Sequence, residues 1–267
     1  MLIADYLLFA PRNILCCFCP VFGDRLLVAP ITTPIDRRTL LGAVKAWLPA
    51  GQWVDVFTGL TYRGGRAMTL YRDLDSIPVL APAGSIVPMV PLGDPAFGTT
   101  NPDAIELRVY AGADGEFTIA EDRDDERWAF TQVRFLDGAV HIDPVEGDIA
   151  SVPPKRRFEI VLCGFTDVHG EPGPVPGSVR VVQPDVAATT GATLRIEGDL
   201  SLRANIDAGN RAFELLDTAQ ISFVLKDQAY RALDGSLDQV IAELTTLDLP
   251  LTLRGALIEL LVANPAL

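Results

Sequence analysis

The chain has 267 residues, which is enough for one large domain or two smaller ones with separate cores. Its formal net charge of −13 argues against a nucleic-acid partner and against docking on an anionic membrane surface, because both need clustered cationic side chains. A hydrophobic fraction of 49% and a charged fraction of 21% exclude a disordered chain.

The N-terminal residues carry no recognisable targeting or membrane signal. Residues 1–10 are apolar but include Asp5, and the interruption Pro11-Arg12-Asn13 leaves two apolar runs that are each too short to cross a bilayer. No small-residue cleavage pattern follows. We expect this stretch to be a truncated internal strand or a non-native start of the chain.

The cysteines are unevenly placed: Cys16, Cys17 and Cys19 are crowded together and Cys163 stands alone. Three neighbouring thiols cannot all pair with one distant partner, so no disulfide framework is predicted. A zinc site would need Cys163 or a histidine as its fourth ligand, and the alternative is free thiols, buried or mildly reactive. We expect free thiols, no bound metal and a reducing compartment, which predicts a cytoplasmic protein.

Short strands separated by turns are predicted along the first part of the chain. Residues 26–29 and 43–48 are apolar runs, and residues 52–57 mostly alternate polar and apolar side chains, as a half-buried strand does. Pro49-Ala50-Gly51 predicts a hairpin turn between the last two. Three more strands continue the series, at residues 67–71, 77–80 and 85–90. This regular spacing predicts an antiparallel β-sandwich.

A second group of strands is expected after the loop at residues 93–103. Residues 106–110 alternate cleanly, and the turn at residues 112–115 predicts pairing with the strands that follow. Those strands are expected at residues 116–119, 128–135 and 157–162. A linker-like stretch at residues 170–177 then precedes one short β region at residues 193–196.

The C-terminal part is predicted to be helical. Apolar side chains recur at three- and four-residue steps along one amphipathic helix, at Ala212, Leu215, Leu216, Ala219 and Phe223. Gly235 can end that helix, and Ser236 with Gln239 predicts a capping box for the next one. Pro250 then precedes a last helix that carries Leu253, Leu257, Leu260 and Leu261. We interpret these stripes as packing surfaces, with a partner-binding surface as the alternative.

Four blocks of sequence occur in an order and spacing that together are specific. They are Phe22–Pro30 (FGDRLLVAP), Trp47–Gly59 (WLPAGQWVDVFTG), Ile77–Pro88 (IPVLAPAGSIVP), and Leu107–Tyr110 (LRVY) with Ala113–Asp122 (ADGEFTIAED). With them the chain resembles the C-terminal part of glycoside hydrolase family 31, which includes α-glucosidases and α-xylosidases. The likeness covers roughly residues 21–164. Two positions depart from it: Pro82 replaces a usual arginine, and residues 123–127 replace a glycine-rich turn.

The resemblance implies a mainly β fold of two small antiparallel β-sandwich domains, proximal and distal, followed by an α-helical tail. The predicted division assigns residues 1–22 to the end of a catalytic barrel or a non-native N-terminus, 23–92 to the proximal sandwich, 93–169 to the distal sandwich, 170–208 to a linker with a short β region, and 209–267 to the helical tail.

The resemblance also implies retaining hydrolysis of α-linked sugars, by two carboxylates carried on a barrel of about 250 residues. Too little sequence precedes Phe22 for such a barrel, and no Asp or Glu of this chain matches the family's catalytic motifs. We therefore predict a non-catalytic portion whose partner is a barrel not encoded in this chain. No catalytic, substrate-binding or metal-binding residue is predicted, and no cofactor.

Other chemistry has weaker support. The acidic residues Glu121, Asp122, Asp124, Asp125 and Glu126 lack calcium-loop spacing, so a solvated loop with local ion pairs is expected. His141 and His169 have no motif partner.

Two alternatives to barrel support remain open. One is a carbohydrate-binding module that presents Trp53, Tyr62 and Tyr71 to sugars. The other is a protein-interaction module that works through the helical tail. Loss of a barrel would in addition expose an apolar face, which predicts self-association.

Overall fold

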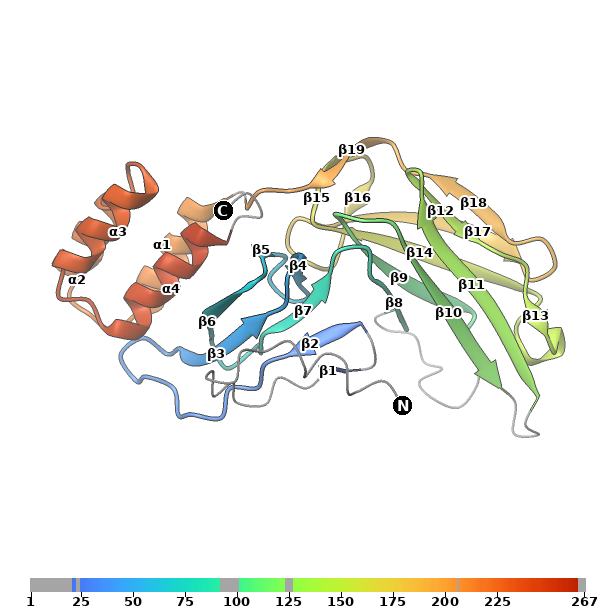
Figure 1. Ribbon diagram of the computed structural model, residues 1–267, viewed down its shortest axis with the longest axis horizontal. Helices are drawn as coiled ribbons and strands as arrows, with labels where there is room; N and C mark the ends of the chain where they lie inside the picture. Colours follow the sequence, from blue (N-terminus) through green and yellow to red (C-terminus); the bar gives the residue numbers. More distant parts are fainter. Residues whose placement is uncertain (1–20, 23–24, 92–100, 123–126, 206, 264–267) are drawn as a thin grey trace. The chain divides into compact units, whose positions relative to one another are not determined.

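In the computed structural model, the described residues are 21–22, 25–91, 101–122, 127–205 and 207–263 (Figure 1). The chain divides into two compact units. Unit 1 combines residues 1–80 with 204–267, and unit 2 spans residues 81–203. The cluster of Cys16, Cys17 and Cys19 lies outside the described residues, as do Asp124, Asp125 and Glu126.

Unit 1 is built on a five-stranded sheet and a two-stranded sheet. The larger sheet has the strand order β1-β2-β7-β4-β5, and the smaller one pairs β3 with β6. Their bounds are β1 Val21–Phe22, β2 Leu26–Val28, β3 Gly42–Leu48, β4 Gln52–Asp55, β5 Thr61–Arg63, β6 Arg66–Arg72 and β7 Val79–Pro82. Along β3, buried and more exposed residues alternate, as the period of a half-buried strand requires.

The predicted hairpin between the strands at 43–48 and 52–57 is wrong. After the turn at residues 49–51, β4 joins the larger sheet beside β5, whereas β3 pairs with β6 along its whole length. Contacts within the turn explain the switch. The Trp53 indole N–H donates to the carbonyl oxygen of Pro49 at 2.9 Å, and the N–H of Gly64 donates to Gly51 at 2.7 Å. The N–H of Gly65 also donates to the carbonyl oxygen of Leu48 at 2.8 Å, so the β5–β6 connection, rather than β4, lies against the end of β3.

Four helices complete the described part of unit 1: α1 Ala208–Thr218, α2 Phe223–Arg231, α3 Leu237–Thr246 and α4 Leu251–Val262. Their apolar faces belong to the same core cluster as the strands, since Leu216, Leu244, Leu253 and Leu257 pack with residues such as Leu48 and Leu70. The core of unit 1 is therefore shared between strands and helices that lie far apart in the sequence.

The single amphipathic helix expected from Ala212 to Phe223 is in fact two helices. Ala219 is extended, with φ −64° and ψ 136°, and Ser222 caps α2 by accepting a hydrogen bond from the N–H of Leu225. Phe223 is consequently 83% exposed and takes no part in the buried stripe. The periodic spacing of apolar residues continues across the break between α1 and α2, so it predicted one helix where Ser222 begins a second one. The predicted bond from the N–H of Ser236 to Gln239 is present at 3.0 Å.

Unit 2 contains two five-stranded sheets that share one core. The first has the order β16-β17-β14-β9-β8; the second has the order β10-β11-β12-β18, with β13 paired to β11. Their bounds are β8 Ile86–Met89, β9 Ala104–Tyr110, β10 Gly115–Asp122, β11 Trp128–Leu136, β12 Ala139–Ile142, β13 Glu146–Gly147, β14 Lys155–Cys163, β16 Glu171–Pro172, β17 Val179–Ala187 and β18 Ala192–Arg195. A further pair joins β15 (Phe165–Val168) to β19 (Gly198–Leu202).

Strand pairing in unit 2 corrects two expectations. The strand at residues 106–110 pairs with β8 and, in parallel, with β14; β10 pairs with β11 instead. The stretch assigned to a linker and a short β region contains β17, which pairs antiparallel with β14 over most of its length. The strand was not predicted because prolines are frequent at the start of this stretch, and proline lowers strand propensity. The mainly β fold followed by helices is confirmed.

Candidate functional site

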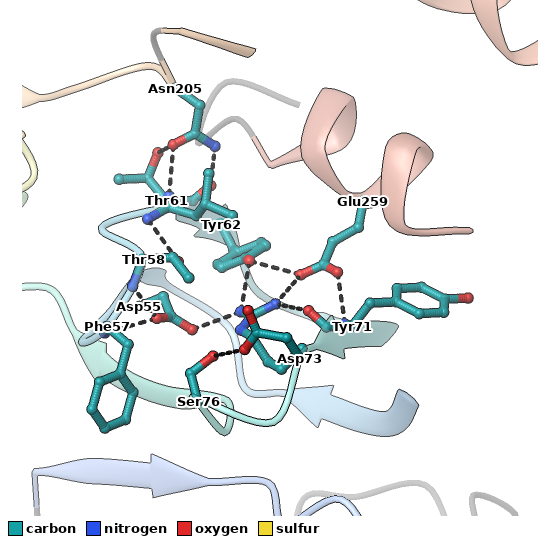
Figure 2. Close-up of polar contacts among 12 residues, drawn as sticks. Asp55, Phe57, Thr58, Thr61, Tyr62, Tyr71, Asp73, Ser76, Asn205 and Glu259 are labelled. Atoms are coloured by element: carbon teal, nitrogen blue, oxygen red, sulfur yellow. Dashed lines mark hydrogen bonds and ion pairs between the residues drawn. The ribbon is translucent and has the colours of Figure 1, made fainter. Parts of the chain in front are cut away.

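The most deeply buried group of charged side chains in the described part of the chain lies in unit 1, where four elements meet (Figure 2). Asp55 ends β4, Tyr62 lies in β5, Arg72 ends β6 and Glu259 lies in α4. None of the four side chains is more than 5% exposed. We call these four residues the Arg72 cluster.

One guanidinium binds both carboxylates of the Arg72 cluster. The Nη2 atom of Arg72 lies 2.7 Å from Oδ2 of Asp55, and its Nη1 atom lies 3.0 Å from Oε1 of Glu259. The Tyr62 hydroxyl donates to the same Glu259 oxygen at 2.9 Å and accepts from Nη2 of Arg72 at 3.2 Å. Such charge-assisted bonds are the strongest hydrogen bonds that a protein interior forms.

Each carboxylate is also fixed by backbone donors. Oδ1 of Asp55 accepts the N–H groups of Phe57 and Thr58 at 2.9 and 2.7 Å, so Asp55 closes the turn after β4. The second oxygen of Glu259 accepts the N–H of Tyr71 at 2.8 Å (Figure 2). A helix side chain thus occupies a hydrogen-bonding position on β6 that a neighbouring strand would otherwise fill.

Burial raises the pKa values of two members of the Arg72 cluster, Glu259 and Tyr62. It raises the pKa of Glu259 above its ordinary value of 4.5, even though Arg72 and the donors of Tyr71 and Tyr62 oppose the shift. The pKa of Tyr62 is raised well above 10.0 by burial and by the charge of Glu259. At Glu259 the cost of burying the charged carboxylate outweighs the attraction of Arg72 and the hydrogen bonds from Tyr71 and Tyr62, which accounts for the direction of its shift.

Glu259 was missed in the sequence. It lies between the buried residues Leu257 and Leu260 of an almost wholly apolar helix. A lone acidic residue inside an apolar stripe is a detectable signal, because a charge is rarely buried without a partner. Gly255, one turn earlier on α4, lets the helix approach Tyr71, since a Cβ there would lie 2.0 Å from the tyrosine oxygen.

A second buried ion pair lies in unit 2. Arg156 holds both oxygens of Glu121 at 2.7 and 2.8 Å, and both side chains are nearly excluded from solvent. Glu121 belongs to the predicted acidic cluster, so this member is a buried strand residue and not part of a solvated loop. A cavity of about 20 Å³ adjoins Arg156. Its volume suits a water molecule and is far too small for a sugar.

The side chains considered for sugar stacking are mostly buried. Trp53 is 6% exposed and Tyr62 is fully buried, while Tyr71 is half-buried. Neither Trp53 nor Tyr62 can therefore stack on a sugar. His141 bonds to Thr193, and His169 lies 3.8 Å from Glu197.

Cys163 is a free, buried thiol whose pKa burial raises to about 12. Within the described ranges, no group of three or more His, Cys, Asp or Glu residues is arranged to hold a metal ion. None of the helices that the structure describes is long and apolar enough to cross a membrane.

Comparisons with known proteins match parts of this chain. Residues 20–87 match the sequence profile of the glycosyl hydrolase family 31 C-terminal domain. The chain is 33% identical over 106 residues to an α-xylosidase of Saccharolobus solfataricus, a match covering 38% of this chain and 13% of that protein. It is 28% identical over 129 residues to α-glucosidase 2 of Bacillus thermoamyloliquefaciens, covering 48% of this chain and 15% of that protein. The matched part is thus a small fraction of either relative's length.

Among solved structures, a family 31 α-xylosidase from Xanthomonas citri aligns with a TM-score of 0.49 and 23% identity. That alignment covers 66% of this chain and 19% of the other.

Proposed function

We propose that this chain, which carries the C-terminal domain of family 31 glycosyl hydrolases, is a non-catalytic β portion that supports the barrel of a glycosidase acting on α-glycosidic bonds. The family match supplies the context. The observation that carries the non-catalytic part is the state of the buried carboxylates, described next.

All five buried carboxylates among the described residues lie within ion-pair distance of an arginine. They are Asp55, Glu106, Glu121, Glu159 and Glu259. A retaining glycosidase needs two carboxyl groups about 5–5.5 Å apart that face a sugar. Asp55 and Glu259 share a site, but Arg72 lies between them and solvent is excluded. These acids are therefore arranged to hold the fold together.

Support for a barrel partner comes from exposed apolar side chains of unit 1. Phe57 is 48% exposed and Ile77 is 42% exposed, on segments joined by the bond from the N–H of Val56 to Val79. Leu74, in the same loop as Ile77, is 78% exposed. Exposed apolar groups that lie close together are typical of an interface. We propose that this surface contacts the barrel.

The catalytic part of the proposal is tested with the purified chain and p-nitrophenyl α-glucoside and α-xyloside. We expect no release of p-nitrophenol above the uncatalysed rate. Turnover that survives repurification and is lost in an Asp55→Asn variant would overturn the proposal, since it would place chemistry in the Arg72 cluster.

The partner part is tested by mixing the chain with the barrel portion of a family 31 α-xylosidase that lacks its own C-terminal domains. Light scattering should show a one-to-one complex, and Leu74→Asp should weaken it, because a charge would then be buried in the contact. Leu251→Asp, at an equally exposed leucine on α4, is the matched control. Absence of a complex, or equal weakening by both variants, would contradict barrel support through this surface.

We also propose a cytoplasmic location, for which the free thiol of Cys163 gives support. Cell fractionation of the native host tests it.

A further inference from the structure

Two aromatic side chains lie next to each other on the outward face of β11. Trp128 is 48% exposed and Phe130 is 41% exposed, with ring centroids 6.4 Å apart and ring planes at 15° (their strand is labelled in Figure 1). The alternate residues Ala129, Thr131 and Val133 are buried. Since successive side chains of a strand point to opposite faces, the core of unit 2 is completed without either ring.

The strands on both sides of β11 place carboxylates beside these rings. Asp122 of β10 is directly opposite Trp128, and Glu146 of β13 is directly opposite Phe130. Directly opposed residues of an antiparallel pair project to the same face of the sheet. Both acidic residues are exposed. We call Trp128, Phe130, Asp122 and Glu146 the β11 platform.

The surface beside the β11 platform carries a small side chain on one side and polar side chains further along. Ala120, opposite Phe130 on β10, adds only a methyl group. Further along the same face, Gln132 is hydrogen-bonded to Thr118 and donates to Glu116 at 3.2 Å. An apolar patch therefore borders a row of hydrogen-bonding groups.

We propose that the β11 platform binds an α-linked oligosaccharide. A pyranose ring has an apolar C–H face, which packs on an aromatic ring, and hydroxyl groups at its edge, which donate to carboxylates. The platform offers both features next to each other. Acidic residues at the directly opposed positions disfavour phosphates and other anions. The choice of α-linked glucans rests on the proposed function, whereas the site itself rests on the geometry of unit 2.

The observations favour a sugar over a protein partner. A stable protein interface buries about 800 Å² on each side, and two half-exposed rings with two carboxylates supply only a fraction of that area. A cationic ligand is the chemical competitor, because both rings and carboxylates attract cations. Salt separates the two: a cation's affinity falls as ionic strength rises, and that of a neutral sugar does not.

The test is calorimetric titration of the full chain with maltotetraose and with isomaltotetraose. We expect binding of at least one sugar, little changed by added salt, and a loss of about tenfold in affinity for Trp128→Ala. Asp122→Asn should weaken binding as well, and Trp128→Phe should retain most of it. The matched control is Phe213→Ala, which removes an exposed ring of unit 1. Circular dichroism establishes that each variant is folded.

Three outcomes would overturn the proposal. The first is no binding of either sugar by the folded chain. The second is sugar binding that Trp128→Ala leaves unchanged. The third is binding of tetralysine, lost in Trp128→Ala and on adding salt, without any sugar binding, which would make the platform a cation site. None of these results bears on hydrolysis or on the barrel complex, so failure here is distinguishable from failure of the proposed function.

Discussion

At the scale of single residues, Arg72 supplies the positive charge that compensates two buried carboxylates of unit 1. Its guanidinium is 5% exposed and bonds to Asp55, Glu259 and the Tyr62 hydroxyl. A buried ion pair need not stabilise a protein more than apolar packing would, but removing one partner leaves a charge without compensation. Here a single substitution would leave two such charges.

We expect Arg72→Met to lower the free energy of unfolding of unit 1 by about 3–5 kcal/mol. Urea denaturation in a Trp128→Phe background measures it, because Trp47 and Trp53 then report on unit 1 alone. The control is Arg63→Met, an exposed arginine on β5, with an expected change of under about 1 kcal/mol. Equal changes in the unfolding free energy of the two variants would show that the buried ion pairs of Arg72 contribute no more to stability than an exposed arginine does.

The raised pKa of Glu259 gives a pH prediction. The folded state holds this proton more tightly than the unfolded state, so the contribution of Glu259 to stability is full below about pH 4.5 and is lost as pH rises through the folded-state pKa. Glu259→Gln cannot titrate. The unfolding free energy of the wild type minus that of the variant should therefore fall as pH rises from 4.5. A difference that stays flat or rises would contradict the shift.

At the scale of elements, close backbone approach fixes two turns of unit 2 against each other. Gly84 precedes β8 and has φ +79°, and Gly115 begins β10. A Cβ on Gly115 would lie 1.7 Å from the carbonyl oxygen of Gly84, and one on Gly84 would lie 2.3 Å from that of Asp114. Neither obstacle is a side chain that could rotate away, so the turns themselves would have to separate.

Gly115→Ala is expected to destabilise unit 2 by about 2–4 kcal/mol. Hydrogen exchange of residues 81–203, read by mass spectrometry, measures the loss. Gly209→Ala is the matched control, since no atom lies within 4 Å of a Cβ at that helical position. The control should be neutral or stabilising by up to about 1 kcal/mol. Unchanged hydrogen exchange in Gly115→Ala would mean that the two turns can move apart without lowering the stability of unit 2.

At the scale of the whole molecule, the helical tail is part of the core of unit 1. Val240, Leu244, Leu253 and Leu257 are buried in the cluster that also contains β-strand residues. The tail considered by itself would be a candidate interaction module, and deleting it would look like a test of that role. The structure shows that the deletion would also open the core.

Deletion of residues 236–267 should therefore unfold unit 1 and leave the β-sheets of unit 2 protected. Hydrogen exchange would show fast exchange in residues 25–80 and retained protection in β9 and β14. If residues 25–80 kept their protection, the helices would be dispensable. Interaction through the tail is better tested with Phe223→Ser, an exposed residue whose replacement leaves the core intact. Light scattering then reads self-association without the confounding loss of fold.

The sequence by itself determined the resemblance to family 31, the mainly β class and the helical end, because ordered motifs and local periodicity encode these features directly. Several strands were placed for the same reason. Strand pairing depends on residues that are distant in the chain, as for β14 and β9. The predicted hairpin after β3 is wrong for the same reason, since β3 pairs with β6 and not with the next strand. Only the tertiary structure united Asp55, Arg72 and Glu259 and placed Trp128 beside Phe130 with Asp122 and Glu146. Burial and register arise from long-range packing, which no local window of sequence contains.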